Sequence, residues 1–425
     1  MNKQNRVLLA PLIRGLLINA MGEPVTAVSG ACEKEDIPAG ALTADLRPVL
    51  REASFREEDA AMLLKEVYAA WEFEMGSAGG AADKEGVKKY PSCIALRDDG
   101  EELSLFWIDR DYDRALKRRD IKDASLLEGR YLRSPVPDGI CGQGASSLGR
   151  EEVVKNRIAL VTGGAQGFGE EIVRGLAASG ALVYIADLNL DGAKVLADEL
   201  NAALKRTAAI PLEVNVADED SVKAMFAAVA ETTGGLDLCV SNAGVLRAGS
   251  VLEQELGDFK FVTDINYTGF FLVSKHCGRI LRRQHLSARN WTTDIIQINS
   301  KSGLEGSNKN GAYAGGKFGG IGLAASFALE LVAYNIKVNA VCPGNFYDGP
   351  LWSDPEKGLF VQYLNTGKVP GAKSIEDVRA FYEAKVPMKR GCTGADVMRA
   401  IYYIVEQEYE TGQAVPVSGG QVMLH

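Results

Sequence analysis

Tyr313 and Lys317 lie four residues apart, and Ser300 precedes the tyrosine by 13 residues. On a helix, a spacing of four places two side chains on one face, one turn apart. A phenol with a reference pKa of about 10 exchanges protons poorly at neutral pH, and a neighbouring ammonium lowers that pKa by stabilising the phenolate. A serine hydroxyl can bind the same substrate oxygen. The three residue types therefore indicate proton transfer to or from an alcohol or carbonyl.

A glycine-rich turn upstream has the context of a nucleotide site. Residues 158–161 form a short apolar run typical of a buried parallel strand, and residues 170–178 have helical periodicity. The turn between them reads Thr162-Gly163-Gly164-Ala165-Gln166-Gly167-Phe168-Gly169. Glycines let the backbone approach a pyrophosphate, and the helix N-terminus supplies N–H groups. The spacing Gly-x-x-x-Gly-x-Gly differs from the dinucleotide-binding pattern Gly-x-Gly-x-x-Gly. Taken alone, the turn could also be a glycine-rich connection that binds no ligand.

An acidic residue follows the next apolar run. Residues 182–186 end at Asp187, 18 residues after Gly169. A carboxylate at this strand end accepts hydrogen bonds from the adenosine ribose and repels a 2′-phosphate. No arginine stands beside it, since Leu188 follows. The sequence therefore favours NAD over NADP, and the alternative is an aspartate that only caps the strand.

Further apolar runs alternate with helical segments, at 210–216, 236–241, 295–299, 336–341 and 414–418. This pattern predicts an α/β fold, a Rossmann-type, doubly wound parallel sheet of seven strands. Ligands of such sheets bind beyond the carboxyl ends of the strands. Ser300 and the tripeptide Asn242-Ala243-Gly244 both follow such an end. We therefore expect the proton-transfer residues and the glycine turn to share one crevice.

Together these motifs resemble the short-chain dehydrogenase/reductase family over residues 151–425. The resemblance also rests on Asn266, on Tyr313-x3-Lys317 and on Pro343-Gly344. It implies that Tyr313 is the general acid/base and that Lys317 binds the nicotinamide ribose and lowers the tyrosine pKa. It further implies that Ser300 orients the substrate oxygen and that Asn266 positions a water linked to Lys317.

The same resemblance implies a set of NAD-binding residues. They are Thr162, Gly163, Gln166, Gly167, Phe168, Gly169, Asp187, Leu188, Asn215, Val216, Asn242, Ala243, Gly244, Tyr313, Lys317, Pro343 and Gly344. Two positions depart from the family pattern. Asn215 stands where an aspartate that reads adenine is common. Residues 345–350 lack the threonine that often holds the nicotinamide carboxamide, a contact that backbone groups would then replace.

A narrower resemblance points to the substrate. Residues 296–303, 317–320, 385–392 and 419–423 resemble bacterial members of the family that interconvert sorbitol 6-phosphate and fructose 6-phosphate with NAD. A phosphorylated polyol or ketose needs cations near the crevice. The candidate substrate residues, each of which could instead be a solvated surface residue, are Arg247, Lys301, Lys309 and Asn345. The alternatives are an unphosphorylated polyol or ketone, and a non-catalytic NAD-sensing protein.

Composition limits the partners. The chain has 425 residues, a net charge of −9 and a pI near 5.2, which argues against nucleic acid and anionic membranes. Seven scattered cysteines and three unclustered histidines indicate reduced thiols in a cytoplasm and no metal site. No run approaches the ~20 apolar residues of a transmembrane helix.

Residues 1–133 are expected to form a smaller α+β domain of unknown role, followed by a linker over 134–150. A helix is expected over 57–74, and a hairpin over 92–108 with an Asp-Gly turn. This domain could mediate assembly, bind a regulatory sugar or cover the active site. The family resemblance implies a homo-tetramer or homo-dimer, formed through the helix after Asn266 and the helix over 314–334.

Overall fold

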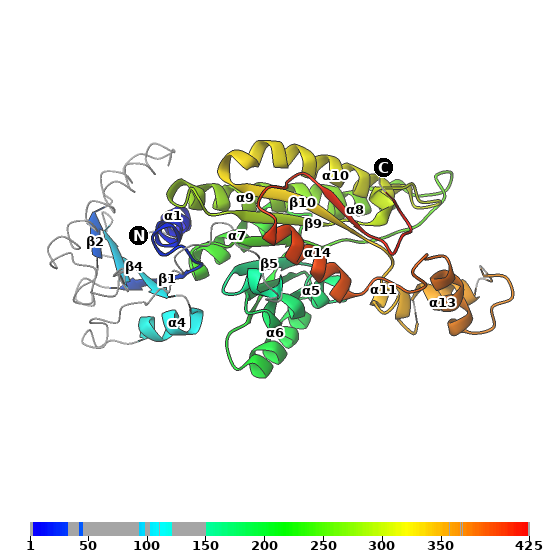
Figure 1. Ribbon diagram of the computed structural model, residues 1–425, viewed down its shortest axis with the longest axis horizontal. Helices are drawn as coiled ribbons and strands as arrows, with labels where there is room; N and C mark the ends of the chain where they lie inside the picture. The colour runs from blue at the N-terminus through cyan, green and yellow to red at the C-terminus, as the bar shows by residue number, and fades with distance from the viewer. Residues whose placement is uncertain are drawn as a thin grey trace.

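The computed structural model describes residues 3–32, 42–45, 93–97, 103–109, 111–120, 150–356, 358–365, 367 and 369–423. Figure 1 shows three parts in a row: an N-terminal unit at the left, a central domain, and a small helical lobe at the right. We call the described residues from 3 to 120 the N-terminal unit. We call the lobe, described over most of residues 350–384, the lid.

Seven parallel strands form the sheet of the central domain: β5 (Ile158–Thr162), β6 (Leu182–Asp187), β7 (Ala209–Glu213), β8 (Leu238–Ser241), β9 (Thr293–Ile298), β10 (Ile336–Pro343) and β11 (Ala414–Val417). Their order is β7-β6-β5-β8-β9-β10-β11, so the chain starts in the middle and winds outward in both directions. Every residue of β5, β8, β9 and β10 is buried, as expected for strands covered on both faces. The predicted seven-stranded, doubly wound fold is confirmed.

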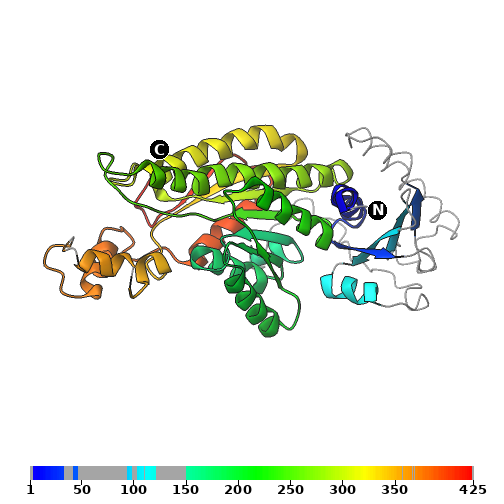
Figure 2. The same cartoon turned by 180° about the vertical axis from the view of Figure 1, so that it is seen from behind.

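Helices cover both faces of this sheet, as Figures 1 and 2 show from opposite sides. One layer holds α5 (Gly167–Ala178), α6 (Leu190–Leu204) and α14 (Gly394–Glu406). The other holds α7 (Glu219–Thr233), α9 (Gly269–Ser287) and α10 (Gly311–Leu331), with α8 (Leu256–Thr263) and the π-helical turn Asp264–Thr268 leading into α9. Each helical layer packs on the sheet through its own hydrophobic core, and successive side chains of β5 point to opposite faces. Ala159 and Val161 belong to the core beneath the first layer, and Ile158 and Leu160 to the core beneath the second.

The lid has an apolar core of its own. It contains α11 (Pro350–Ser353), α12 (Leu359–Asn365) and α13 (Ile375–Ala384). The ring of Trp352 lies 4.9 Å from that of Tyr347 and 5.1 Å from that of Phe360, measured between centroids. Tyr347 belongs to the connection from β10, so this aromatic cluster attaches the lid directly to a strand end.

The N-terminal unit contains a second, separate sheet. Its strands are β1 (Thr26–Cys32), β2 (Leu42–Asp45), β3 (Cys93–Arg97) and β4 (Leu103–Asp109), in the order β1-β4-β3-β2, and α4 (Tyr112–Asp120) follows. The antiparallel pairing of β3 with β4 agrees with the expected hairpin. Its Asp-Gly turn, the helix expected over 57–74 and the linker up to residue 149 lie outside the described residues.

Helix α1 (Lys3–Met21) packs against the central domain instead of standing apart from it. The apolar positions Leu9, Leu12 and Leu16 are buried, with 0–1% of their surface exposed. At Gly15 an added Cβ would lie 2.2 Å from the carbonyl oxygen of Gln284, so only glycine permits this approach to α9. Pro11 and Gly15 both disfavour a helix in isolation, and the tertiary packing overrides that propensity.

Arg14, which interrupts the apolar sequence of α1, is fully buried and fully engaged. Its guanidinium donates to Asp237 Oδ2 and to Gln284 Oε1, both at 2.7 Å, and to the carbonyl of Val25 at 2.8 Å. Asp237 Oδ2 also accepts the N–H of Ile158 at 2.8 Å, at the start of β5. Burial would raise the pKa of Asp237, but the charge and hydrogen bonds of Arg14 outweigh it and hold that pKa below its ordinary value. Arg14 thus anchors the N-terminal unit to the base of the central sheet.

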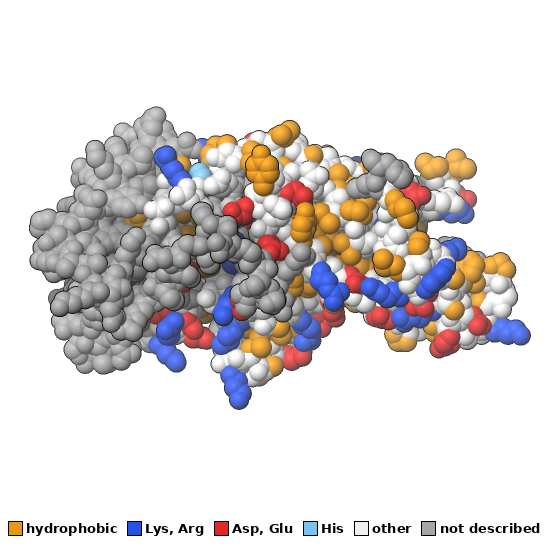
Figure 3. Space-filling model, in the orientation of Figure 1, with side chains coloured by type: hydrophobic (Ala, Val, Ile, Leu, Met, Phe, Trp, Pro, Cys, Tyr) orange, Lys and Arg blue, Asp and Glu red, His pale blue; other side chains and the backbone are white. Residues whose placement is uncertain are grey.

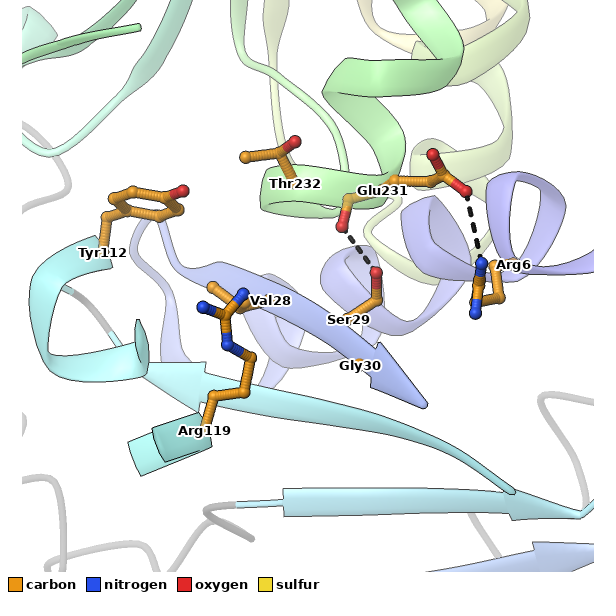
Figure 4. Close-up of a pocket in the computed structure, with 8 residues that line it drawn as sticks. All are labelled: Arg6, Val28, Ser29, Gly30, Tyr112, Arg119, Glu231 and Thr232. Carbon is orange, nitrogen blue, oxygen red and sulfur yellow. Dashed lines mark hydrogen bonds and ion pairs between the residues drawn. The ribbon is translucent and has the colours of Figure 1, made fainter. Parts of the chain in front are cut away.

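A hollow of about 410 Å³ lies where the N-terminal unit meets the end of α7. Figure 4 shows its lining residues, which come from α1, β1, α4 and α7. Ser29 donates to the carbonyl of Glu231 at 2.6 Å, and Arg6 pairs with the Glu231 carboxylate at 3.7 Å. The N-terminal unit therefore contacts α7 as well as α9.

One helical stretch, Gly311–Tyr334, has the length and hydropathy of a membrane-spanning helix, although the sequence predicts none. Its apolar composition comes from the alanines, glycines and leucines of α10. In this fold α10 packs against β10 and presents a largely uncovered outer face. The helix therefore has a place in the layer that covers the sheet.

Candidate active site

The carboxyl ends of β5, β6, β8, β9 and β10 bring the sequence-predicted residues to one edge of the sheet. In Figure 1 the chain passes from the end of β10 into the lid. The glycine turn follows β5, Asp187 ends β6, Asn242 follows β8 and Ser300 lies two residues beyond β9. The predicted residues therefore share the sheet edge beyond which ligands of such folds bind.

The glycine turn needs its glycines for two different reasons. Gly163 and Gly167 have φ values of +62° and +61°, a region that favours glycine. At Gly169 an added Cβ would lie 1.9 Å from the carbonyl oxygen of Gly163. Gln166 at the N-cap of α5 makes no side-chain hydrogen bond to the helix, so the first N–H groups of α5 face the turn without a side-chain acceptor from the cap residue. These features fit a dinucleotide pyrophosphate.

Thr162 and Asn242, both predicted to bind the cofactor, hold the glycine turn in place. Thr162 Oγ1 accepts the N–H groups of Asn242 and Ala243 at 3.1 and 3.2 Å. The Asn242 amide donates to the carbonyls of Thr162 and Gly163 at 3.0 and 2.9 Å. Their polar groups thus join the ends of β5 and β8, and they fix the backbone of the glycine turn.

The Asp187 carboxylate is fixed beside the glycine turn. Its oxygens accept the N–H groups of Ala165 and Asn189, each at 2.9 Å. The next residue, Leu188, has 70% of its surface exposed to solvent. At the next strand end, the Asn215 side chain accepts the N–H of Ala217 at 3.1 Å, and Val216 is buried. A negative charge therefore stands at the expected position of the adenosine ribose.

Ser300, Tyr313 and Lys317 converge as predicted. The Ser300 side chain faces the Tyr313 hydroxyl closely enough to lower its pKa, and Ser300 Oγ accepts the N–H of Ser302 at 3.1 Å. Both Tyr313 and Lys317 lie in the first two turns of α10. The buried Lys317 ammonium lies 5.6 Å from the Tyr313 ring centroid and donates to the carbonyl of Ile298 at 2.9 Å. The three groups can hold and protonate one substrate oxygen.

The pKa of Tyr313 differs from the expectation. The sequence predicts that Lys317 lowers it, whereas in the structure burial of the phenolate raises it and outweighs the hydrogen bond from Ser300. Burial also lowers the pKa of Lys317 to about 8, which weakens the charge that would stabilise a phenolate. The protein's own groups therefore favour the neutral phenol, the form that donates a proton to a carbonyl.

The Asn266 side chain is used within the protein. Its amide donates to the carbonyl of Val245 and accepts the N–H of the same residue, both at 2.8 Å. A Cβ at Gly244 would lie 3.2 Å from Asn266 Oδ1 and 3.7 Å from the Lys317 ammonium. Asn266 therefore braces the chain after β8 next to Lys317, and its role in positioning a water remains a prediction from the resemblance.

The connection after β10 folds over the glycine turn. Gly344 donates to the carbonyl of Val417 at 2.9 Å, and Asn345 donates through its amide to the Tyr347 hydroxyl at 3.3 Å. Phe346 stacks on Phe168 of the glycine turn, with centroids 4.5 Å apart and planes inclined by 14°. Sequence reasoning did not select Phe346, because only the fold brings these two distant aromatic residues together.

The candidate substrate cations have different surroundings. Lys301 is partly buried beside Ser300, and burial lowers its pKa. Arg247 pairs with Asp258 and lies over the Phe261 ring at 4.2 Å. Lys309 is exposed and its carbonyl accepts the N–H of Gly249 at 2.9 Å, which places its loop beside that of Arg247. Of these three, Lys301 is fixed nearest to Ser300, which it follows in the sequence.

Two arginines that follow the lid in the sequence share one acidic partner. Figure 3 shows basic and acidic side chains intermixed over the lower right of the molecule. Arg390 binds both oxygens of Asp396, at 2.5 and 3.0 Å, and Arg399 lies 3.4 Å from the same carboxylate. These arginines are therefore weaker candidates for a phosphate than Lys301.

Comparison with known proteins places this site in a family. Residues 157–354 match the family model described as short chain dehydrogenase. Sorbitol-6-phosphate 2-dehydrogenase of Escherichia coli (strain K12) is 37% identical over 270 residues, which span 63% of this chain and 99% of that protein. Trans-4-hydroxycyclohexanecarboxylate dehydrogenase of Sinomonas cyclohexanicum is 31% identical and is covered over 93% of its length.

Solved structures agree with the fold. A crystal structure of sorbitol-6-phosphate 2-dehydrogenase from Erwinia amylovora has a TM-score of 0.58 and 38% identity, and covers 63% of this chain and 100% of that one. An actinorhodin polyketide ketoreductase with NADPH has a TM-score of 0.54 and 29% identity, and covers 62% of this chain and 97% of that one. Because 63% of this chain accounts for the whole Erwinia protein, the rest of this chain has no counterpart there.

Proposed function

The chain belongs to the short-chain dehydrogenase/reductase family, and from this premise we propose that it is an NAD-dependent oxidoreductase that interconverts sorbitol 6-phosphate and fructose 6-phosphate. The observation that carries the proposal is the close approach of Ser300 to Tyr313, with Lys317 beside them, in a chain 37% identical to a sorbitol-6-phosphate 2-dehydrogenase. Bound NAD would supply the hydride acceptor. The glycine turn and Asp187 would hold it.

The protein's own residues would handle the proton. In polyol oxidation, Ser300 orients the C2 hydroxyl and Tyr313, as phenolate, removes its proton. In ketose reduction, the neutral Tyr313 donates a proton to the carbonyl oxygen. The buried Lys317 ammonium favours the phenolate while it stays charged. This arrangement argues for an enzyme over the NAD-sensing alternative, which needs no proton-transfer residues.

The preference for NAD is tested at Asp187. In Asp187→Ser, the ratio of kcat/KM for NAD to that for NADP is expected to fall at least about tenfold, because the carboxylate that repels a 2′-phosphate is lost. Asp191→Ser, with the same loss of charge at a side chain 92% exposed in α6, is the control. A wild-type protein that uses both cofactors equally would contradict this part of the proposal.

The phosphate on the substrate is tested at Lys301. In Lys301→Ala, KM for sorbitol 6-phosphate is expected to rise about tenfold or more, since a charge-assisted hydrogen bond is lost. Turnover of free sorbitol should not change. Lys223→Ala, at an exposed position of α7, is the matched control.

Equal kcat/KM for sorbitol 6-phosphate and sorbitol in the wild-type protein would instead favour a dehydrogenase of an unphosphorylated polyol or ketone. An equal loss with both substrates in Lys301→Ala would mean that Lys301 supports Ser300 without binding phosphate.

We further propose a cytoplasmic homo-dimer or homo-tetramer. Helices α9 and α10 each present an exposed aromatic side chain, Phe271 and Phe318, with 41% and 47% of their surface exposed. Helix α1 of the N-terminal unit packs on α7 and α9 at the end of the central domain opposite the lid (Figures 1 and 2). Most of α10 lies away from this contact. Five described cysteines are free and buried, as suits a reducing compartment.

A further inference from the structure

The stack of Phe346 on Phe168 joins the glycine turn to the segment after β10 that lacks the threonine expected from the family resemblance. Phe168 sits between Gly167 and Gly169, in the turn whose backbone fits the pyrophosphate. Phe346 follows Pro343-Gly344 within the segment that lacks the usual threonine. The rings lie nearly parallel, 4.5 Å apart, and both side chains are partly buried. The two segments that would flank the dinucleotide are thus joined by an aromatic contact.

The surrounding backbone is built closely around the Phe346 ring. Gly349 donates to the carbonyl of Phe346 at 3.1 Å, closing a turn, and an added Cβ at Gly349 would lie 2.5 Å from Phe346 Cδ1. A Cβ at Gly167 would lie 3.9 Å from Pro350 Cδ. Pro350 therefore lies near the glycine turn, and the missing side chain at Gly349 leaves the space that the Phe346 ring occupies.

The residues next to Phe346 belong to the lid. Tyr347 is 1% exposed in the aromatic core of the lid and donates to the carbonyl of Tyr382 at 3.0 Å. Asp348 pairs with Arg379 of α13 at 2.8 Å. Adjacent side chains thus point into two different structures, the glycine turn and the lid. A displacement of Phe346 would be transmitted to both.

We propose that Phe346 is a positioning residue for the nicotinamide half of the dinucleotide, which it holds by stacking on Phe168 and tying the lid to the pyrophosphate turn. This inference rests on the proposed function, because it needs a dinucleotide in the crevice. It assigns to an apolar stack the anchoring for which the chain has no threonine. The adenosine half, held near Asp187, is not affected.

The test compares ligands that do and do not reach the stack. In the full-length protein, Phe346→Leu keeps an apolar side chain but removes the ring. The Kd for NADH is expected to rise about fivefold to tenfold, the range of an aromatic pair, while the Kd for AMP stays within about twofold. Phe381→Leu, which removes an exposed ring from α13 of the lid, should change neither value.

A second variant keeps the ring and moves it. Gly349 has φ −80°, so Gly349→Ala is acceptable to the backbone, but the new methyl group must push the Phe346 ring away. It should weaken NADH binding like Phe346→Leu, with an unchanged melting temperature as the check on folding. Unchanged NADH affinity in both variants, or equal losses of NADH and AMP, would overturn the proposal. If the wild-type protein binds neither NADH nor NADPH, the proposed function itself fails.

Discussion

Tyr313→Phe is expected to lower kcat for polyol oxidation and ketose reduction by about 100- to 10,000-fold, the usual contribution of a general acid/base. The substitution removes only the hydroxyl that faces Ser300. The Kd for NADH should stay within about twofold, because the glycine turn and Asp187 are untouched. Tyr409→Phe, at a fully exposed position, is the control.

The pH profile of the wild-type enzyme adds a second readout for the same residue. Burial raises the pKa of Tyr313, so little phenolate is present at neutral pH. Oxidation needs the phenolate and is therefore expected to accelerate as the pH rises, whereas reduction needs the phenol and should slow. Residual activity of Tyr313→Phe should lose this dependence. A variant with near wild-type kcat would remove Tyr313 from the chemistry.

Arg14→Met is expected to lower the free energy of unfolding by about 3–5 kcal/mol, because it leaves the buried Asp237 charge without its partner. Asp237 is 0% exposed and also binds the N–H of Ile158 in the central strand β5. The loss should appear in denaturant unfolding of the full chain. Arg399→Met makes the same change at a side chain 73% exposed and should cost less than about 1 kcal/mol.

A double variant separates the charge from the packing of α1. If the cost of Arg14→Met comes from the uncompensated carboxylate, then Asp237→Asn in the same chain should recover part of it. Equal effects of Arg14→Met and Arg399→Met would show that α1 does not stabilise the central domain. We also expect residues 151–425 alone to be less stable than the full chain, although the sorbitol-6-phosphate 2-dehydrogenases named above match only about that length.

The sequence predicts the central domain well because its signals are local. The apolar run before Gly163, the strand-end Asp187 and the four-residue spacing of Tyr313 and Lys317 each report on one element. Parallel topology then brings strand ends to one edge without further information. Local spacing could not give the direction of the Tyr313 pKa, since that depends on burial produced by the whole fold.

The missed features are contacts between distant segments. Helix α1 contains Pro11, Gly15 and a charged Arg14, which argue against a buried helix until Asp237 and Gln284 are seen opposite the arginine. The Phe168–Phe346 stack has no periodicity or motif of its own. Likewise, Arg247 looked like a phosphate ligand until the fold placed Asp258 against it.

The reaction itself gives the most direct test of the proposed function. The full-length protein is incubated with sorbitol 6-phosphate and NAD, and NADH absorbance and fructose 6-phosphate are measured together. We expect equimolar NADH and fructose 6-phosphate from the wild-type protein and almost none from Tyr313→Phe. Tight NADH binding with no turnover of sorbitol 6-phosphate or of any other polyol would contradict it and support an NAD-sensing protein.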